Sequence, residues 1–268
     1  MRRVLPRAGS LLLALAVSAC SNDSAPTRPA PVEAAAVHSE IEELDMRLSL
    51  AMAARDRPSA DKKLDATRKP ISVLEFLGIG SGMAVLDVNA GGGYYTELLA
   101  AAVGPNGVVY AQNDVVALER EDNQVARELD ARLAGNRLPN VFRLDEDLEN
   151  LELEHVFDAG VLMVTLHDIY NLHGELKTVE LLRRIRKALK PGAVLGVIDH
   201  VAEASQAVDP RTLHRIEEAT AFRLLQAAGF AIDGRSDALA NPKDPHDHNV
   251  MHESVRDRTD RFILRARA

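Results

Sequence analysis

The sequence predicts an α/β protein with a mostly parallel sheet that is covered by helices on both faces. Short apolar runs alternate with segments of helical periodicity along most of the chain, the pattern expected when helices connect parallel strands. The apolar run at 85–88 leads into a glycine-rich turn at 91–93 that opens a helix. About 230 residues follow residue 37, a length that suits one such domain.

Each expected element has a local signal. Apolar residues at helical spacing predict helices at 41–54 and 68–77, and the glycines of 78–82 form the turn before the first strand. The seven expected strands are 85–88, 108–111, 141–144, 159–164, 194–198, 230–232 and 261–266, with the last as an antiparallel edge. The remaining helices are expected to include 97–100 and to cover 115–133, 175–189 and 211–228.

The first twenty residues have the features of an export signal. Arg2, Arg3 and Arg7 precede an apolar run at 11–17 that is too short to span a bilayer, and the small residues of 17–19 follow. Cys20 is the only cysteine, so it cannot form an internal disulfide. Its position resembles a bacterial lipobox, which implies a signal peptide over 1–19 and a periplasmic lipoprotein anchored to the membrane through Cys20. An ordinary signal peptide with a chance cysteine is the alternative.

Residues 20–37 are rich in Ser, Pro and Ala, a composition typical of a semi-extended tether. We therefore expect the domain to cover 38–268. The chain has a net charge of −8; without the three arginines of 1–19, 29 basic residues stand against 40 acidic ones, a formal charge of −11. Such a surface argues against nucleic acid or anionic lipid as a partner, which leaves lipidated Cys20 as the membrane contact.

The glycine turn points to a nucleotide-like ligand. A dinucleotide fingerprint is disfavoured because Thr96 stands where the third small residue is needed, and no G-K-[ST] follows to form a phosphate loop. The remaining pattern, Asp87 near the end of a strand and then Gly91, Gly92 and Gly93, resembles motif I of the class I S-adenosylmethionine-dependent methyltransferases. A glycine turn without a ligand stays open as the alternative.

The resemblance extends over about residues 70–268. Phe157-Asp158 and 189–192 match further landmarks of that superfamily, and the resemblance implies its Rossmann-like sandwich and S-adenosyl-L-methionine as cofactor. Five short segments resemble, more narrowly, a group of exported bacterial predicted methyltransferases: 166–168, 198–200, 213–215, 241–242 and 259–262.

The same resemblance implies the cofactor-binding residues. The residues after the first strand would face the cofactor, and Asp87 would order the turn or reach the methionine ammonium; the implied set is Asp87, Asn89, Ala90, Gly91, Gly92, Gly93 and Tyr94. Asn113 stands where the superfamily has an acid that grips the ribose, so either Asp114 substitutes or affinity is weak. Asp145 resembles the acid that takes the adenine amino group, with a solvated acidic loop as the alternative.

Two His/Asp pairs follow neighbouring strands and are the candidate catalytic residues. His167 and Asp168 follow the fourth expected strand, and Asp199 and His200 end the fifth, so both pairs are expected at one wall of the pocket. His167 is the expected general base for removing a proton from the acceptor. The pairs could instead bind a metal or cap loops. The polar segment 244–252, with three histidines, suggests metal affinity, a lid or a solvated loop.

Three functions remain open at this point. The first is an exported S-adenosylmethionine-dependent methyltransferase acting on a small-molecule or cell-envelope acceptor. The second is an exported ligand-binding module that kept the fold and lost transfer, because S-adenosylmethionine is made in the cytoplasm and Asn113 departs from the expected acid. The third is a metal-dependent enzyme using the His/Asp pairs. Fold alone does not separate them.

Overall fold

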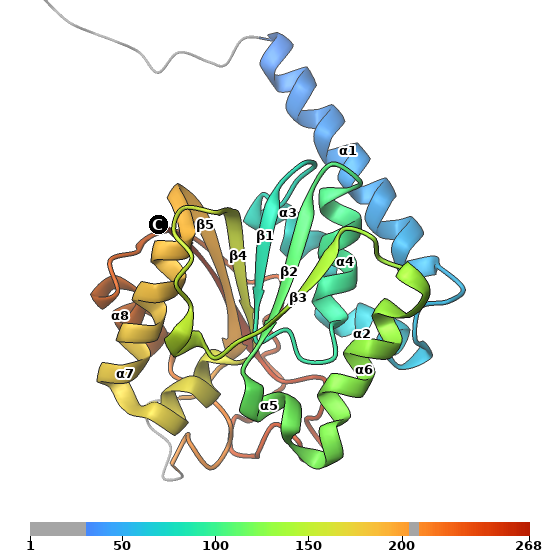
Figure 1. The fold of residues 1–268 in the computed structure, drawn as a ribbon. Coiled ribbons are helices and arrows are strands. Elements are labelled where there is room, and N and C mark those ends of the chain that lie inside the picture. Colours follow the sequence, from blue (N-terminus) through green and yellow to red (C-terminus); the bar gives the residue numbers. More distant parts are fainter. Residues whose placement is uncertain (1–30, 204–208) are drawn as a thin grey trace, which may run out of the picture.

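The computed structural model describes residues 31–203 and 209–268 (Figure 1). The predicted signal peptide, Cys20 and residues 20–30 of the predicted tether lie outside them. Seven strands form one sheet in the order β3-β2-β1-β4-β5-β7-β6. The strands are β1 (Ala84–Val88), β2 (Val108–Asn113), β3 (Val141–Asp145), β4 (Phe157–Met163), β5 (Leu189–His200), β6 (Ala231–Ser236) and β7 (Arg261–Arg267).

The sheet confirms the predicted fold class. The strands from β1 to β5 pair in parallel, and β7 runs antiparallel to β5 as expected. However, β7 is not the edge: it lies between β5 and β6, and β6 forms the edge. The apolar residues of β7 are buried on both faces, as an inner strand requires, whereas buried and exposed positions alternate in β6.

Helices cover both faces of the sheet (Figure 1). On one face lie α1 (Pro31–Ala53), α3 (Pro70–Leu77), α4 (Tyr94–Val103) and α6 (Gln124–Leu133), which share an apolar core with Val85 and Val109. On the other face α7 (Leu166–Ala188) and α8 (Glu218–Ala227) pack on Leu86 and Leu195. Leu44 and Leu48 of α1 are buried in the first core, so α1 is part of the domain.

Four predicted helices differ from the observed ones. Helix α1 begins at Pro31, so residues 31–37 of the expected tether are helical; proline is compatible with a first helical turn, and the alanines that follow favour a helix. The expected helix 115–133 is divided into α5 (Val115–Glu119) and α6, because Asp122 and Asn123 adopt left-handed backbone conformations. Helix α7 starts nine residues earlier than expected and bends at Gly174, where φ is 73°. The expected helix 211–228 is helical only in α8.

A further helix, α2 (Ser59–Arg68), was not predicted. Its sequence, SADKKLDATR, is mostly polar, and Leu64 is its one large apolar residue, so it carries no apolar stripe. Lys69 adopts a left-handed conformation at its end and separates it from α3. This polar helix reaches the functional region, because Asp65 and Thr67 contact residues of the site described below.

Candidate active site

A cavity of about 370 Å³ lies beyond the carboxyl ends of β1, β2 and β4, where the strand order reverses. We call it the donor cavity. Its polar lining includes residues at the ends of three strands and in the segments that follow: Asn89, Gly91, Asn113, Asp114, Asp147, Thr165 and Asp168. Its apolar lining includes Val116, Leu148, Ile169, Leu172 and Leu181.

The glycine turn is held by the end of β2. The Gln112 side chain accepts the Asn89 N–H at 3.0 Å, and its backbone carbonyl accepts the Ala90 N–H at 2.9 Å. Asn113 Oδ1 accepts the Gly91 N–H at 2.8 Å, and Asn113 Nδ2 donates to the Gly91 carbonyl at 3.3 Å. The Gly91 N–H is therefore already bonded to Asn113. Asn113 lines the cavity, but both polar atoms of its side chain are hydrogen-bonded to the Gly91 backbone and are therefore not free to bind a ribose.

The three glycines have different surroundings. A Cβ on Gly91 would meet nothing within 4 Å, and Gly91 lines the donor cavity. A Cβ on Gly92 would lie 2.3 Å from the Glu128 carboxylate, and one on Gly93 would lie 2.9 Å from Arg132 Cδ. Gly92 and Gly93 thus allow close packing against α6 and do not line the cavity, contrary to expectation.

Arg132 fixes the turn from the α6 side, a role that the sequence did not reveal. Its Nε donates to the Gly92 carbonyl at 2.7 Å, and its guanidinium pairs with Glu97 of α4 and, at 2.8 Å, with Asp61 of α2. Arg132 and Glu97 are both buried. A charged network therefore ties the turn to α2, α4 and α6.

Asp87 and Tyr94 face away from the donor cavity. Asp87 is 1% exposed and accepts the Thr96 hydroxyl at 2.6 Å, which ties β1 to α4; burial raises its pKa to about 7. This contact agrees with the expectation that Asp87 orders the glycine turn. It leaves no direct contact between Asp87 and the methionine part of a cofactor in the donor cavity. The Tyr94 hydroxyl donates to Asp65 Oδ1 at 2.8 Å, and the Arg68 guanidinium lies 4.3 Å from its ring centre. Neither Tyr94 nor Ala90 lines the cavity, so the geometry gives their expected cofactor contacts no support.

Asp114 and Asp147 are two of the acidic residues that line the donor cavity. Asp114 Oδ1 accepts from Gln112 Nε2 at 3.0 Å and from the Leu148 N–H at 2.9 Å, which fixes the carboxylate at the end of β2. Asp147 Oδ1 accepts the Val115 N–H at 2.8 Å. Asp145 instead pairs with Arg143 at 2.6 Å and does not line the cavity, so the geometry gives the expected adenine contact no support.

The donor cavity fits a ligand with nucleoside and amino-acid parts. Two polar atoms around it, Asn89 Oδ1 and Thr165 Oγ1, are buried and have no hydrogen-bond partner among the described residues. Buried polar atoms usually have partners, so these two are suited to a polar ligand. The apolar lining suits a base, and Asp114 suits ribose hydroxyls.

A second cavity of about 340 Å³ adjoins the first, and Asp168 lines both. We call it the acceptor cavity. It is lined by His167, His200 and His214, and the ring centres of His167 and His200 are 5.7 Å apart. Three of the four residues of the predicted His/Asp pairs, His167, Asp168 and His200, line this cavity, and the buried Asp199 lies behind His167.

His167 is held between two carboxylates. Its Nδ1 is 2.6 Å from Asp199 Oδ1, its backbone N–H donates to Asp199 Oδ2 at 2.8 Å, and its Nε2 is 3.2 Å from Asp168 Oδ1. Burial alone would lower the pKa of His167, but Asp199 and Asp168 raise it to about 10. Both ring nitrogens of His167 therefore face carboxylates, a contact that the sequence did not show because Asp199 reaches across from β5. The general-base role of His167 stays a prediction.

His200 and His214 have separate environments. His200 Nδ1 lies 2.7 Å from the Thr259 hydroxyl, and burial lowers the pKa of His200 to about 3, so it is neutral. His214 lies in the turn before α8 and not in a helix as expected; its Nδ1 is 2.9 Å from Asp168 Oδ1. Thr259 and His214 therefore belong to the site, although neither was among the predicted site residues.

The segment 244–252 packs against the domain. Asp244 forms a buried pair with Arg215 at 2.8 Å, and His246 lies 3.0 Å from both Glu203 and Asp260. His248 and His252 are nearer to solvent, with ring centres 4.4 Å apart. The expectation of a plain solvated loop is therefore wrong for its buried half.

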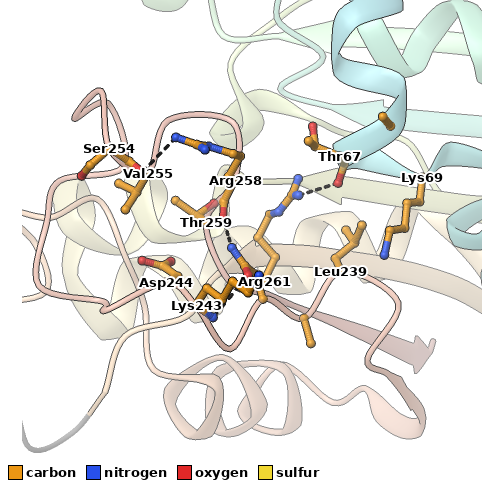
Figure 2. A pocket seen from close by; sticks show the side chains of 13 residues that line it. Thr67, Lys69, Leu239, Lys243, Asp244, Ser254, Val255, Arg258, Thr259 and Arg261 are labelled. Atoms are coloured by element: carbon orange, nitrogen blue, oxygen red, sulfur yellow. Dashed lines mark hydrogen bonds between the residues drawn. The ribbon is translucent and has the colours of Figure 1, made fainter.

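Basic residues surround the acceptor side. Arg68, Arg256 and Arg261 line the acceptor cavity, and Arg261 and Thr259 also line a third cavity of about 430 Å³ with Lys69, Lys243 and Arg258 (Figure 2). Arg261 is 8% exposed; it donates to the Thr67 carbonyl at 2.6 Å, and its Nε has no partner among the described residues. Burial lowers its pKa. This basic lining contrasts with the net charge of −8 of the chain.

Comparisons with known proteins agree with this geometry. The family model of Protein-L-isoaspartate(D-aspartate) O-methyltransferase (PCMT) matches residues 59–142. This segment runs from α2 into β3 and includes the glycine turn; of the acceptor-cavity lining it includes Arg68 and Tyr95, and it ends before the three histidines.

Solved structures of methyltransferases and of a cyclase share the fold. A SAM dependent methyltransferase from Aquifex aeolicus is 23% identical, with 78% of this chain and 97% of that chain covered and a TM-score of 0.56. An S-adenosylmethionine dependent methyltransferase from Mesorhizobium loti is 18% identical, with 76% and 100% covered and a TM-score of 0.52. The [4+2]-cyclase SpnF is 22% identical, with 80% and 85% covered and a TM-score of 0.54.

The fold is that of the class I S-adenosylmethionine-dependent methyltransferases, and the matching family model covers the part of the chain that carries the glycine turn. The predicted resemblance is confirmed at the level of the fold. In the described parts of the chain, 31–203 and 209–268, we find no helix that is both long and apolar enough to cross a membrane.

Proposed function

We propose that the protein transfers a methyl group from S-adenosylmethionine to an anionic oxygen of an acceptor bound in the acceptor cavity. The observation that carries this proposal is the junction of the two cavities at Asp168, with three arginines lining the acceptor side. Two cavities that share a wall allow donor and acceptor to meet while each keeps its own binding residues.

The donor cavity would hold the cofactor through residues that are already in place. Asn89 and Gly91 would hold the amino-acid end, Asp114 the ribose, and Val116 and Leu148 the base. Bound S-adenosylmethionine supplies an electrophilic methyl group for in-line displacement. Asn113 and Arg132 act indirectly, since both fix the turn that carries Gly91.

An anionic acceptor matches the chemistry of the acceptor cavity. Both ring nitrogens of His167 face carboxylates, so His167 is not placed to remove a proton from an alcohol. A carboxylate oxygen already has the lone pair it needs and loses no proton when it is methylated. The name of the matching family specifies O-methylation of isoaspartate or D-aspartate in proteins, and we carry over only the class of oxygen acceptor.

We also propose that this reaction takes place outside the cytoplasm, on a small-molecule or cell-envelope acceptor. The support is the charged and apolar pattern of residues 1–19 and the position of Cys20. A supply of S-adenosylmethionine in that compartment is then required. Binding of the cofactor product without any transfer would favour the alternative of a ligand-binding module.

The test uses S-adenosylmethionine that carries tritium in its methyl group, incubated with the protein and cell-envelope extract. Methyl esters of carboxylates are hydrolysed by alkali, so the label should become volatile as methanol after mild base treatment. An Arg261→Met variant should lose most of this label while keeping its affinity for S-adenosylhomocysteine, because Arg261 lines only the acceptor side. Label that stays base-stable would contradict an anionic carboxylate acceptor.

A further inference from the structure

We propose that His167, Asp168 and His214 form a binding site for a divalent transition-metal ion at the junction of the donor and acceptor cavities. One ligand atom from each of these residues lies within 4.8 Å of the others. All three residues line the acceptor cavity, and Asp168 also lines the donor cavity. The site is argued from these side chains alone, whereas its role in catalysis rests on the proposed function.

The donor set is typical of borderline metal ions. Asp168 Oδ1 lies 3.2 Å from His167 Nε2 and 2.9 Å from His214 Nδ1, so the carboxylate oxygen stands between two imidazoles. Two imidazole nitrogens and one carboxylate oxygen suit Zn²⁺, Co²⁺, Fe²⁺ or Mn²⁺, whereas Mg²⁺ and Ca²⁺ prefer oxygen ligands alone. Three protein ligands leave further coordination positions free.

Asp199 orients His167 as outer-sphere carboxylates orient metal-binding histidines. It is fully buried, lies 2.6 Å from His167 Nδ1 and also accepts the backbone N–H of His167. A carboxylate on Nδ1 fixes the ring and leaves Nε2 for a metal. In this structure Nε2 is directed toward Asp168, the second ligand.

The third ligand is also held in place, although its side chain is exposed. His214 lies between Leu213 and Arg215, both buried, and Arg215 is anchored by its pair with Asp244. The Leu213 carbonyl accepts the Val250 N–H at 3.1 Å, which joins this turn to the segment 244–252. The sequence therefore builds a rigid support under a residue whose own side chain contributes nothing to the core.

A metal ion in this position would hold an anionic oxygen of the acceptor. The free coordination positions would be reached from the acceptor cavity, where Arg68, Arg256 and Arg261 provide further positive charge. Because Asp168 also lines the donor cavity, an oxygen on the metal would lie next to the bound cofactor. The acceptor class that follows is a carboxylate or another anionic oxygen ligand.

The test is a titration of the full-length protein, stripped with a chelator, with Co²⁺ and Zn²⁺. We expect one ion per chain, with the visible absorption bands of a nitrogen- and oxygen-coordinated Co²⁺. The Asp168→Asn and His214→Ala variants should each weaken Co²⁺ binding by at least about tenfold. Both side chains are exposed, so these variants leave the core intact.

A matched control removes a different pair of histidines. The His248→Ala/His252→Ala double variant deletes two neighbouring imidazoles outside the site and should bind Co²⁺ like the unmodified protein. Failure to bind one ion per chain, or loss of binding only in this control, would overturn the metal proposal. Calorimetry with S-adenosylhomocysteine on the same samples reports the donor cavity separately, so failure of the metal site and failure of the proposed function are distinguishable.

Discussion

Asn113 binds both polar groups of Gly91: its Oδ1 accepts the Gly91 N–H at 2.8 Å, and its Nδ2 donates to the Gly91 carbonyl at 3.3 Å. The amide that departs from the expected ribose acid is therefore the residue that holds the glycine turn. The carboxylate that we propose for binding the ribose belongs to the next residue, Asp114, which lines the same cavity.

Because Asn113 supports the turn and Asp114 is proposed to bind the ribose, substitutions at these two positions should differ in their effects on stability and on ligand affinity. Asn113→Ala removes both hydrogen bonds to the turn and should lower the free energy of unfolding by about 1–3 kcal/mol. Asp114→Asn keeps an Oδ1 acceptor for Gln112 and Leu148 but loses its charge, so stability should change little.

In contrast, Asp114→Asn should weaken S-adenosylhomocysteine binding by about tenfold, because hydrogen bonds to a charged acceptor are the stronger kind. Chemical denaturation and calorimetry measure the two effects. Equal losses of stability in both variants would contradict the assignment.

The glycine turn gives a second contrast. Gly91→Ala places a methyl group where nothing lies within 4 Å, at φ 58°, so it should cost about 1 kcal/mol of stability from backbone strain and reduce S-adenosylhomocysteine affinity strongly. Gly92→Ala collides with Glu128 and should cost about 1–3 kcal/mol through overpacking, with a smaller effect on affinity. Thermal denaturation with and without ligand separates the two, and a reversed order would show that Gly91 is not the cavity residue.

Asp87 predicts a pH dependence of stability. Its folded-state pKa, about 7, lies above the ordinary value of 3.8, so the folded protein binds this proton more tightly than the unfolded chain. The stabilisation is therefore complete below pH 4 and is lost as the pH rises through 7, by at most about 4 kcal/mol. Asp87→Asn has no such proton, and the difference in unfolding free energy between the two proteins should change in this window. A constant difference from pH 4 to 8 would show that Asp87 titrates normally.

Cys20 is predicted to carry a lipid after removal of residues 1–19, because small residues precede it and a Ser/Pro/Ala-rich segment follows. Mass spectrometry of the membrane fraction should find a diacylated N-terminal cysteine, and Cys20→Ser should release the protein from the membrane. An unmodified Cys20, or a mature chain that starts elsewhere, would end this hypothesis.

The apolar pattern predicted the sheet well, because β1, β4 and most of β5 are buried apolar runs bounded by turn residues. It missed α2, a polar helix without an apolar stripe, and it did not reveal the left-handed Asp122 and Asn123 that separate α5 from α6. Such features depend on tertiary contacts rather than on local periodicity.

The sequence predicted where the site lies in the fold, but not the contacts of its individual residues. The motif placed Gly91 correctly at the cavity, and strand adjacency brought His167 and His200 together. The roles of individual residues depend on partners distant in the sequence, such as Asp199 on His167. Arg261 is a similar case, because its place at two cavities follows from β7 lying inside the sheet.

The central claim is that the donor cavity binds S-adenosylmethionine next to a separate acceptor cavity. Calorimetric titration with S-adenosylhomocysteine tests it most directly, with the unmodified protein, Asp114→Asn and Arg261→Met compared side by side. The account predicts one site per chain, weakened binding in Asp114→Asn and unchanged binding in Arg261→Met. Absence of binding to the unmodified protein, or loss of binding only in Arg261→Met, would contradict it.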